Sequence, residues 1–158
     1  MQLASNFKAI NNEANFGSPI TDEVVGGAHI TFEFITRKRN VYFMTRWPNG
    51  LPRHEDPTNC LRFPHGLLQF GETVDQCAKR IVSAQLGFSV KNAKVVAIDS
   101  YLDEMGHWHI EPCCIVEVAG RFQVPYQASE IVSFTVDKLP HMTFWKRKQF
   151  LDFISQYG

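Results

Sequence analysis

The pattern of apolar and polar positions along the chain predicts a protein built mainly from short strands. Seven stretches are rich in β-branched and aromatic residues and are bounded by turn residues, as is typical of strands. These stretches are 28–36, 41–46, 61–63, 67–70, 94–102, 107–118 and 129–136. Polar turns at 37–40 and 103–106 predict two pairs of directly connected strands. The first pair is 28–36 with 41–46, and the second is 94–102 with 107–118.

Two segments have helical periodicity instead. The first begins at Thr73, a good N-cap with Gln76 three positions later, and is expected to end at Gly87. Its apolar face comprises Val74, Cys77, Ala78, Ile81 and Gln85. The second helix is an amphipathic segment over 141–157. This order of elements favours an α/β fold, in which a mixed sheet carries a helix on each face.

Length and composition indicate one domain. The chain has 158 residues, enough to bury a core, and no repeat, linker or charge block divides it. We expect residues 25–158 to form the domain, after a polar, Asn-rich arm over 1–24. A loop over 47–60 carries three prolines, and loops of this length are often functional. The 13 phenylalanines predict a core or cleft rich in aromatic rings.

Charge and cysteine usage limit the partners and the compartment. Lys+Arg and Asp+Glu both number 16, so no basic field is available for polymeric nucleic acid, although a single nucleotide remains compatible. No apolar run approaches the ~20 residues that span a membrane, and the N-terminus lacks a signal peptide, so we expect a cytoplasmic protein. The four cysteines form no C-x-x-C pair and are expected to be free, buried thiols.

The spacing of four residues in 66–88 carries the strongest functional signal. Gly66, Glu72, Arg80 and Gly87 follow the pattern G-x5-E-x7-R-x6-G. This pattern resembles the Nudix box, the signature of enzymes that hydrolyse nucleoside diphosphates linked to another group. The resemblance extends to Met44-Thr45-Arg46, to Pro64-His65-Gly66, and to the segment from Ser129-Glu130 to Leu139-Pro140. It implies the Nudix fold, an α/β/α sandwich around a mixed β-sheet.

The resemblance fails at the metal-binding positions of the box. The family has three glutamates on one face of the helix after its arginine, and here these positions are Ile81, Ala84 and Gln85. Mg²⁺ takes hard oxygen ligands, which isoleucine and alanine lack and glutamine supplies only weakly. We therefore expect binding of Mg²⁺ or Mn²⁺ to be weakened. Glu72 is retained, either as a brace with Arg80 or as a remaining metal ligand and catalytic residue.

Polar residues outside the box are candidates to compensate for the lost glutamates. Glu130 matches the place of a catalytic base in some Nudix proteins, and the alternative is a surface carboxylate. His107, His109 and Glu111 share one side of a strand, where they form either a ligand site or a solvated face. The remaining ligand-binding candidates are His65, beside the box, and the arginines Arg46 and Arg62, which suit phosphate oxygens.

Three functions are compatible with these residues. The first is a Nudix-fold protein that binds a nucleotide, a nucleotide sugar or a similar small molecule without efficient hydrolysis. The second is an active Nudix-type pyrophosphohydrolase that uses Glu72 with carboxylates outside the box, such as Glu130 or Glu111. The third is a non-enzymatic interaction domain, with a homodimer as one form that it could take.

Overall fold

The computed structural model describes residues 28–47, 60–102, 108–125, 128 and 130–158. Its elements follow in the order β1 (Ala28–Lys38), β2 (Val41–Trp47), β3 (Cys60–Arg62), β4 (His65–Leu67), α1 (Val74–Leu86), β5 (Ser89–Leu102), β6 (Trp108–Ala119), β7 (Glu130–Phe134) and α2 (Arg147–Tyr157). The predicted arm over 1–24, the loop between β2 and β3 and the turn over 103–106 lie outside the described residues.

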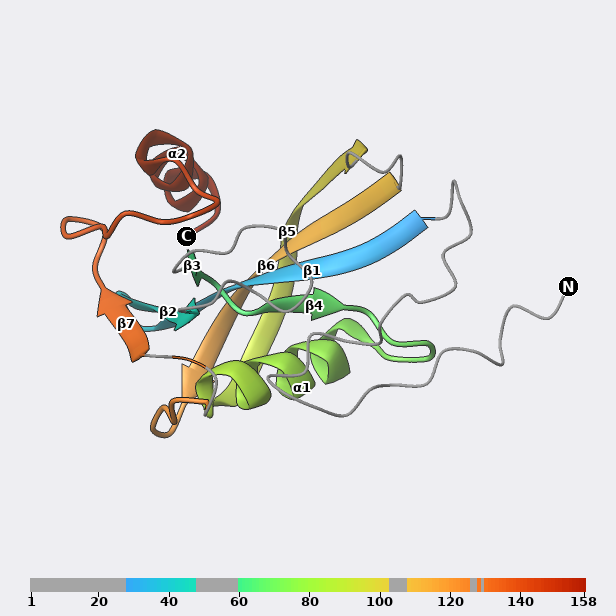
Figure 1. Cartoon of the computed structure of the whole chain (residues 1–158), viewed down its shortest axis with the longest axis horizontal. Helices are drawn as coiled ribbons and strands as arrows, with labels where there is room; N and C mark the ends of the chain where they lie inside the picture. The colour runs from blue at the N-terminus through green and yellow to red at the C-terminus, as the bar shows by residue number, and fades with distance from the viewer. Residues whose placement is uncertain (1–27, 48–59, 103–107, 126–127, 129) are drawn as a thin grey trace, which may run out of the picture.

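The strands form one mixed sheet around β1. Among the described residues the sheet has seven strands in the order β3-β2-β1-β6-β5, with β4 paired to β1 and β7 paired to β2 (Figure 1). β1 runs parallel to β6 over almost its whole length, from Ala28 opposite Trp108 to Arg37 opposite Glu117. It is antiparallel to β2 and to β4. The predicted mixed sheet is therefore confirmed.

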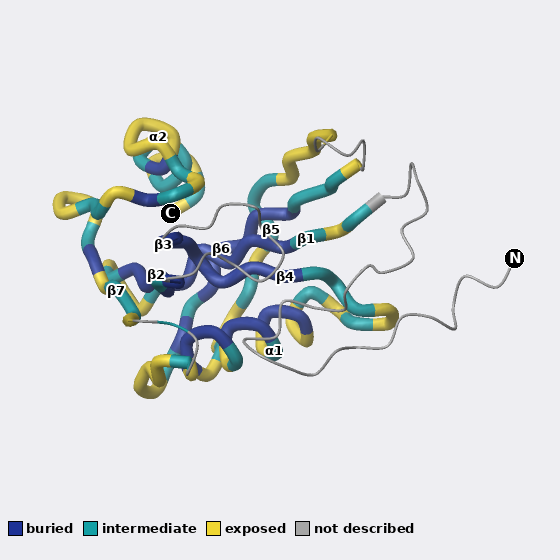
Figure 2. The backbone as a smooth tube through the Cα atoms, viewed as in Figure 1, coloured by how far each residue is buried: buried dark blue, intermediate teal, exposed yellow. Residues whose placement is uncertain are grey.

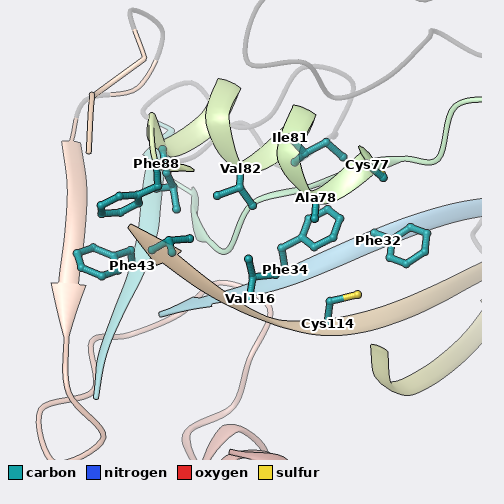
Figure 3. Close-up of a cluster of buried hydrophobic side chains, with 12 residues drawn as sticks. Phe32, Phe34, Phe43, Cys77, Ala78, Ile81, Val82, Phe88, Cys114 and Val116 are labelled. Atoms are coloured by element: carbon teal, nitrogen blue, oxygen red, sulfur yellow. The ribbon is translucent and has the colours of Figure 1, made fainter. Parts of the chain in front are cut away.

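Helices cover both faces of the sheet, and each closes an apolar core. Side chains from the inner face of α1 pack on one face of β1 and β6, where Phe34, Cys114 and Val116 are fully buried (Figure 3). The opposite face packs against α2 and the segment before it, around Phe150. The buried residues concentrate in the strands at the centre of the sheet and on the side of α1 that faces them (Figure 2). This is the α/β/α sandwich that the sequence predicted.

The core on the α2 face consists largely of aromatic rings. Phe150 is fully buried, and its ring lies 5.6 Å from Tyr42, 5.6 Å from Phe63 and 6.0 Å from Phe134, centroid to centroid. Stacked and edge-to-face pairs at such distances add to the stabilisation from buried area. Most of the described phenylalanines thus serve the core, as expected, while Phe70, Phe122 and Phe144 are exposed.

Three predicted boundaries were wrong, and tertiary contacts account for the first two. The last helix begins at Arg147 rather than 141, because Thr143 bonds to β3: its N–H donates to the Leu61 carbonyl at 3.0 Å, and its hydroxyl accepts the Leu61 N–H at 2.8 Å. β5 begins at Ser89 rather than 94, since β6 is long enough to pair its polar first residues. The strand predicted over 67–70 is β4, which ends at Leu67 where the chain turns towards α1.

The cysteines agree with a further expectation. All four cysteines are free and buried, and burial raises the pKa of the Cys77 and Cys114 thiols to about 12. Such thiols stay protonated and unreactive at neutral pH. None of the helices in the described part of the chain is long and apolar enough to cross a membrane.

Candidate functional site

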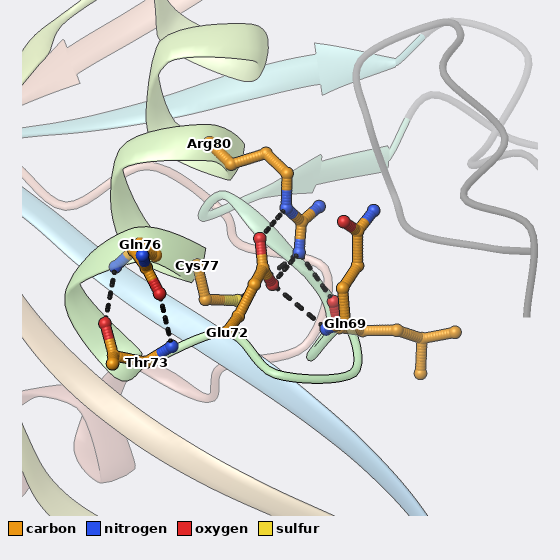
Figure 4. A network of polar contacts seen from close by, with 7 residues as sticks. Gln69, Glu72, Thr73, Gln76, Cys77 and Arg80 are labelled. Carbon is orange, nitrogen blue, oxygen red and sulfur yellow. Dashed lines mark hydrogen bonds and ion pairs between the residues drawn. The ribbon is translucent and has the colours of Figure 1, made fainter. Parts of the chain in front are cut away.

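The box segment folds as the loop–helix–loop that its spacing predicts. Thr73 caps α1 in a capping box: the Gln76 N–H donates to the Thr73 hydroxyl at 3.3 Å, and the Thr73 N–H donates to the Gln76 side chain at 2.8 Å (Figure 4). Gly87 ends the helix with a φ of 74°, in the left-handed region that favours glycine. A Cβ at Gly87 would also lie 2.6 Å from the backbone nitrogen of Gln123. The predicted scaffold of the box is therefore intact.

Glu72 and Arg80 form a two-pronged ion pair that ties the loop to the helix. The Arg80 Nε and Nη2 atoms donate to the two Glu72 oxygens at 2.5 and 2.7 Å, and the Gln69 N–H donates to Glu72 Oε2 at 3.0 Å (Figure 4). Arg80 Nη2 also bonds to the Leu67 carbonyl at 2.9 Å. Burial opposes ionisation of Glu72, but the bonds from Arg80 and Gln69 outweigh it and hold its pKa below the usual range. This geometry fits the brace interpretation of Glu72.

The three substituted positions of the box do not form a cation site. Ile81 and Gln85 are fully buried, and Ile81 is part of the apolar core under α1. Gln85 binds the backbone of His65 at both ends of its amide: Nε2 donates to the His65 carbonyl at 2.7 Å, and Oε1 accepts the His65 N–H at 3.2 Å. The one side-chain oxygen of the set that could bind a metal thus holds β4 against α1. No group of three His, Cys, Asp or Glu suitable for a metal occurs among the described residues.

Arg46 and Glu130 lie together on neighbouring strands. They are direct partners in the β2–β7 ladder, and Arg46 Nε donates to Glu130 Oε1 at 2.5 Å. The Glu130 side chain is about half exposed, at 53%. The structure therefore gives Glu130 a partner in Arg46 and shows no contact between Glu130 and Glu72.

A second polar cluster lies on the sheet face that α2 covers, and it contains two of the predicted ligand-binding residues. Arg62 Nη2 lies 3.8 Å from Glu111 Oε1, and the Arg62 guanidinium carbon lies 4.2 Å from the ring centroid of Phe144. Trp145 Nε1 donates to Glu33 Oε2 at 3.1 Å. Arg62 and Glu33 are 5% and 6% exposed, so their charges are almost removed from water.

The charges of this cluster are only partly compensated. Burial, aided by the Glu111 charge, raises the pKa of Glu33 to about 7, although Arg62 and the hydrogen bond from Trp145 act in the opposite direction. Burial also raises the pKa of Glu111. Glu33 Oε1 and Arg62 Nε are buried with no hydrogen-bond partner among the described residues. Buried polar atoms of this kind commonly mark a place for water or a ligand.

The two histidine candidates lie next to this cluster. His65 is buried in β4 directly opposite Glu33, and its ring Nδ1 is 3.4 Å from the Phe63 carbonyl. His109 stacks on Tyr101 with ring centroids 4.9 Å apart, and the His29 ring approaches it edge-on at 4.9 Å. Of the two interpretations of this side of the strand, a solvated face does not fit Glu111, which is largely buried beside Arg62. His107 lies outside the described residues.

Sequence reasoning missed Glu33 as a member of the site. A signal for Glu33 was present, since it is the one carboxylate in the apolar stretch 28–36 and is flanked by Phe32 and Phe34. A charge in such a strand is buried on whichever face it occupies, and buried charges are rare without partners. Its partner Trp145 is 112 residues away in sequence, and only the fold brings the two together.

Comparison with known proteins rests on structure alone. No protein-family model matches the sequence, and no curated protein is significantly similar to it. A MutT Nudix hydrolase from Burkholderia pseudomallei superposes with a TM-score of 0.64 at 16% identity, covering 83% of this chain and 98% of that one. A MutT protein from Methanosarcina mazei Go1 gives 0.65 at 12% identity, covering 85% and 98%. A Nudix hydrolase from Nitrosomonas europaea gives 0.56 at 18%, covering 70% and 74%. The chain therefore has the Nudix fold.

Proposed function

We propose that this protein binds a nucleotide-type small molecule, a nucleoside diphosphate derivative, and lacks the metal-dependent hydrolysis of a complete Nudix box. The observation that carries the proposal is the buried amide of Gln85. Both ends of this amide bond to the backbone of His65 at a position where the box pattern has a glutamate. The substitution thus replaces a metal ligand with a structural clamp, and the scaffold around it is kept.

The residues of the box do not fit a divalent cation. Mg²⁺ and Mn²⁺ require several carboxylate, carbonyl or water oxygens in an octahedral shell. Of the four acidic positions in the pattern only Glu72 remains, and both of its oxygens accept hydrogen bonds from Arg80. Ile81 is buried in the apolar core and offers no oxygen. We therefore assign no catalytic step to a metal in this protein.

Support for ligand binding comes from the second polar cluster. Arg62 and Glu33 each present a buried polar atom that has no partner among the described residues, a donor on one and an acceptor on the other. The Phe144 ring, which is 45% exposed, lies over the Arg62 guanidinium and links the cluster to the surface. A ligand with adjacent donor and acceptor groups would satisfy both atoms, and nucleobases have such edges.

Calorimetric titration of the full chain with ADP-ribose and with a nucleoside triphosphate, in EDTA, Mg²⁺ or Mn²⁺, tests this function. We expect binding that is independent of the metal and no release of phosphate in a parallel assay. Arg62→Gln should weaken binding at least tenfold, whereas the matched variant Arg46→Gln should not, because Arg46 is paired with Glu130 on β2 and β7.

The two alternatives give different results. Metal-dependent turnover that Glu72→Gln abolishes would establish the hydrolase that uses Glu72 with outside carboxylates, a function suggested by the hydrolase names of the structural neighbours. A chain that binds none of these ligands would favour the interaction domain. Affinity lost in Arg46→Gln but kept in Arg62→Gln would place the ligand beside Glu130 and overturn the assignment to the Arg62 cluster.

A further inference from the structure

The outer strand of the sheet, β5, has two halves of different character. In the described sheet β5 is the last strand on its side and pairs only with β6. Its first half carries exposed Lys91 and Lys94 and two irregularities in its pairing, at Val90/Asn92 and Val95/Ala97. Lysines and bulges are the usual devices that keep an edge strand from pairing with another chain. The second half, from Ala97 to Leu102, is regular and contains no lysine.

This second half is exposed and apolar on one side. Ile98 and Leu102 are 68% and 71% exposed, and on the neighbouring strands Trp108 and Ile30 are 47% and 38% exposed. The register places Leu102 opposite Trp108, and Ile98 opposite Pro112. All of these side chains point to the sheet face that α1 covers elsewhere. Side chains alternate between the two faces of a strand, and Cys114 and Val116, at even positions of β6 like Trp108, belong to the core under α1. The patch thus runs across three strands and reaches the edge; the exposed end of β5 is coloured yellow in Figure 2.

No strand of the described residues pairs with the outer edge of this half strand. Ser100 N–H donates to the side chain of its own neighbour, Asp99 Oδ1, at 2.8 Å. That N–H therefore points away from β6. Because outward-pointing N–H groups occur at every second residue of an edge strand in an antiparallel ladder, the N–H groups of Ile98 and Leu102 also point outward. The carbonyl oxygen of another strand can replace the Asp99 side chain as the acceptor of this N–H.

We propose that β5 pairs antiparallel with β5 of a second copy of this chain, around a two-fold axis at Ser100. This register sets Ser100 opposite itself and Ile98 opposite Leu102 of the second copy. Asp99 then faces Tyr101 of the second copy, whose hydroxyl can donate to the carboxylate. No two like charges face each other over 98–102, and the apolar rows of both copies become continuous. An isologous contact of this kind buries the same residues on both sides and closes as a dimer.

A second copy fits this edge better than an unrelated strand because the segment is complementary to itself. With the axis at Asp99 instead, two carboxylates would oppose each other, which is destabilising. With the axis at Ser100, the two large aliphatic side chains meet across the interface, and cross-strand pairs of this kind stabilise sheets. The pairing involves neither Gln85 nor the buried Arg62 and Glu33, so it does not rest on the proposed function.

A single engineered cysteine tests the register. In Ser100→Cys the two copies would bring their Cα atoms to about 5.5 Å, the spacing of a hydrogen-bonded antiparallel pair, which lies within disulfide range. We expect a covalent dimer under mild oxidation. Ser89→Cys is the matched control, exposed at the other end of the same strand, and should stay uncrosslinked. The four native cysteines are buried and do not interfere.

Light scattering and sedimentation test the dimer itself. The wild-type chain of 18.1 kDa should show twice this mass with a concentration-dependent equilibrium. Ile98→Lys should shift that equilibrium to the monomer by at least tenfold, while Val136→Lys, an exposed apolar residue outside β5, should not. Circular dichroism spectra like that of the wild type show that folding is kept in both variants. Slower amide exchange of Ser100 at high protein concentration gives a second readout. A monomer at all concentrations, or a dimer that both lysine variants retain, would overturn the proposal.

Discussion

Replacing Gln85 with glutamate restores the residue type of the box pattern, yet we expect it to destabilise this protein as the pH rises. The Gln85 side chain is fully buried, its Nε2 lies 2.7 Å from the His65 carbonyl, and the described part of the chain holds no cluster of metal ligands around it. A neutral glutamic acid can keep both bonds, because its O–H replaces the amide donor. An ionised carboxylate cannot, since it would set a charged oxygen against the carbonyl oxygen.

The magnitude follows from proton linkage. The unfolded chain has the ordinary glutamate pKa of about 4.3, and each pKa unit corresponds to about 1.36 kcal/mol. Keeping the buried carboxyl neutral therefore costs ~1 kcal/mol at pH 5 and ~3.7 kcal/mol at pH 7. The sign is that of an acid whose folded pKa is raised: the stability of the variant falls as the pH rises above the unfolded pKa. For a chain of this size the loss at pH 7 corresponds to roughly 8–15 °C in Tm.

Urea denaturation of Gln85→Glu and the wild type at pH 5 and pH 7, in EDTA, measures this difference. Subtracting the wild-type free energy of unfolding at each pH removes the titration of all other groups. Gln76→Glu is the matched control, because Gln76 is exposed on the same helix at a position where glutamate suits the capping box. A Gln85→Glu variant as stable as the wild type at pH 7, or with a pH-independent deficit, would refute the role assigned to the amide.

Two further variants test other parts of the structure. Glu33→Gln removes a buried carboxyl whose pKa is about 7. Relative to the wild type, the variant should gain up to about 3–4 kcal/mol in free energy of unfolding between pH 4 and pH 8, measured by urea denaturation. A difference between variant and wild type that does not change with pH would contradict the burial of this charge. Gly87→Ala should lose at least about 1–2 kcal/mol, because alanine resists the left-handed conformation and its Cβ would clash with Gln123, whereas Ser83→Ala on the same helix should cost less.

Much of the local structure was predictable from the sequence, because it depends on interactions between neighbours in the chain. The capping box of Thr73 and Gln76 and the left-handed stop at Gly87 act within one or two helical turns, and both were predicted where they occur. The spacing of Gly66, Glu72, Arg80 and Gly87 identified the Nudix fold for the same reason, since the loop–helix–loop that they build is local. Runs of β-branched and aromatic residues also predicted the strands at the centre of the sheet.

Only the tertiary structure decided which polar residues act together. Glu33 becomes a buried charge because α2 and the segment before it bring Trp145 onto β1, a contact between residues 112 positions apart. The start of α2 is likewise set by the bonds of Thr143 to Leu61, which no local pattern records. The sequence alone showed that Gln85 had replaced a glutamate; the fold showed that its amide is used to hold His65. Helix caps and turns depend on neighbouring residues, whereas the burial of a side chain and its hydrogen-bond partners depend on the packing of distant segments.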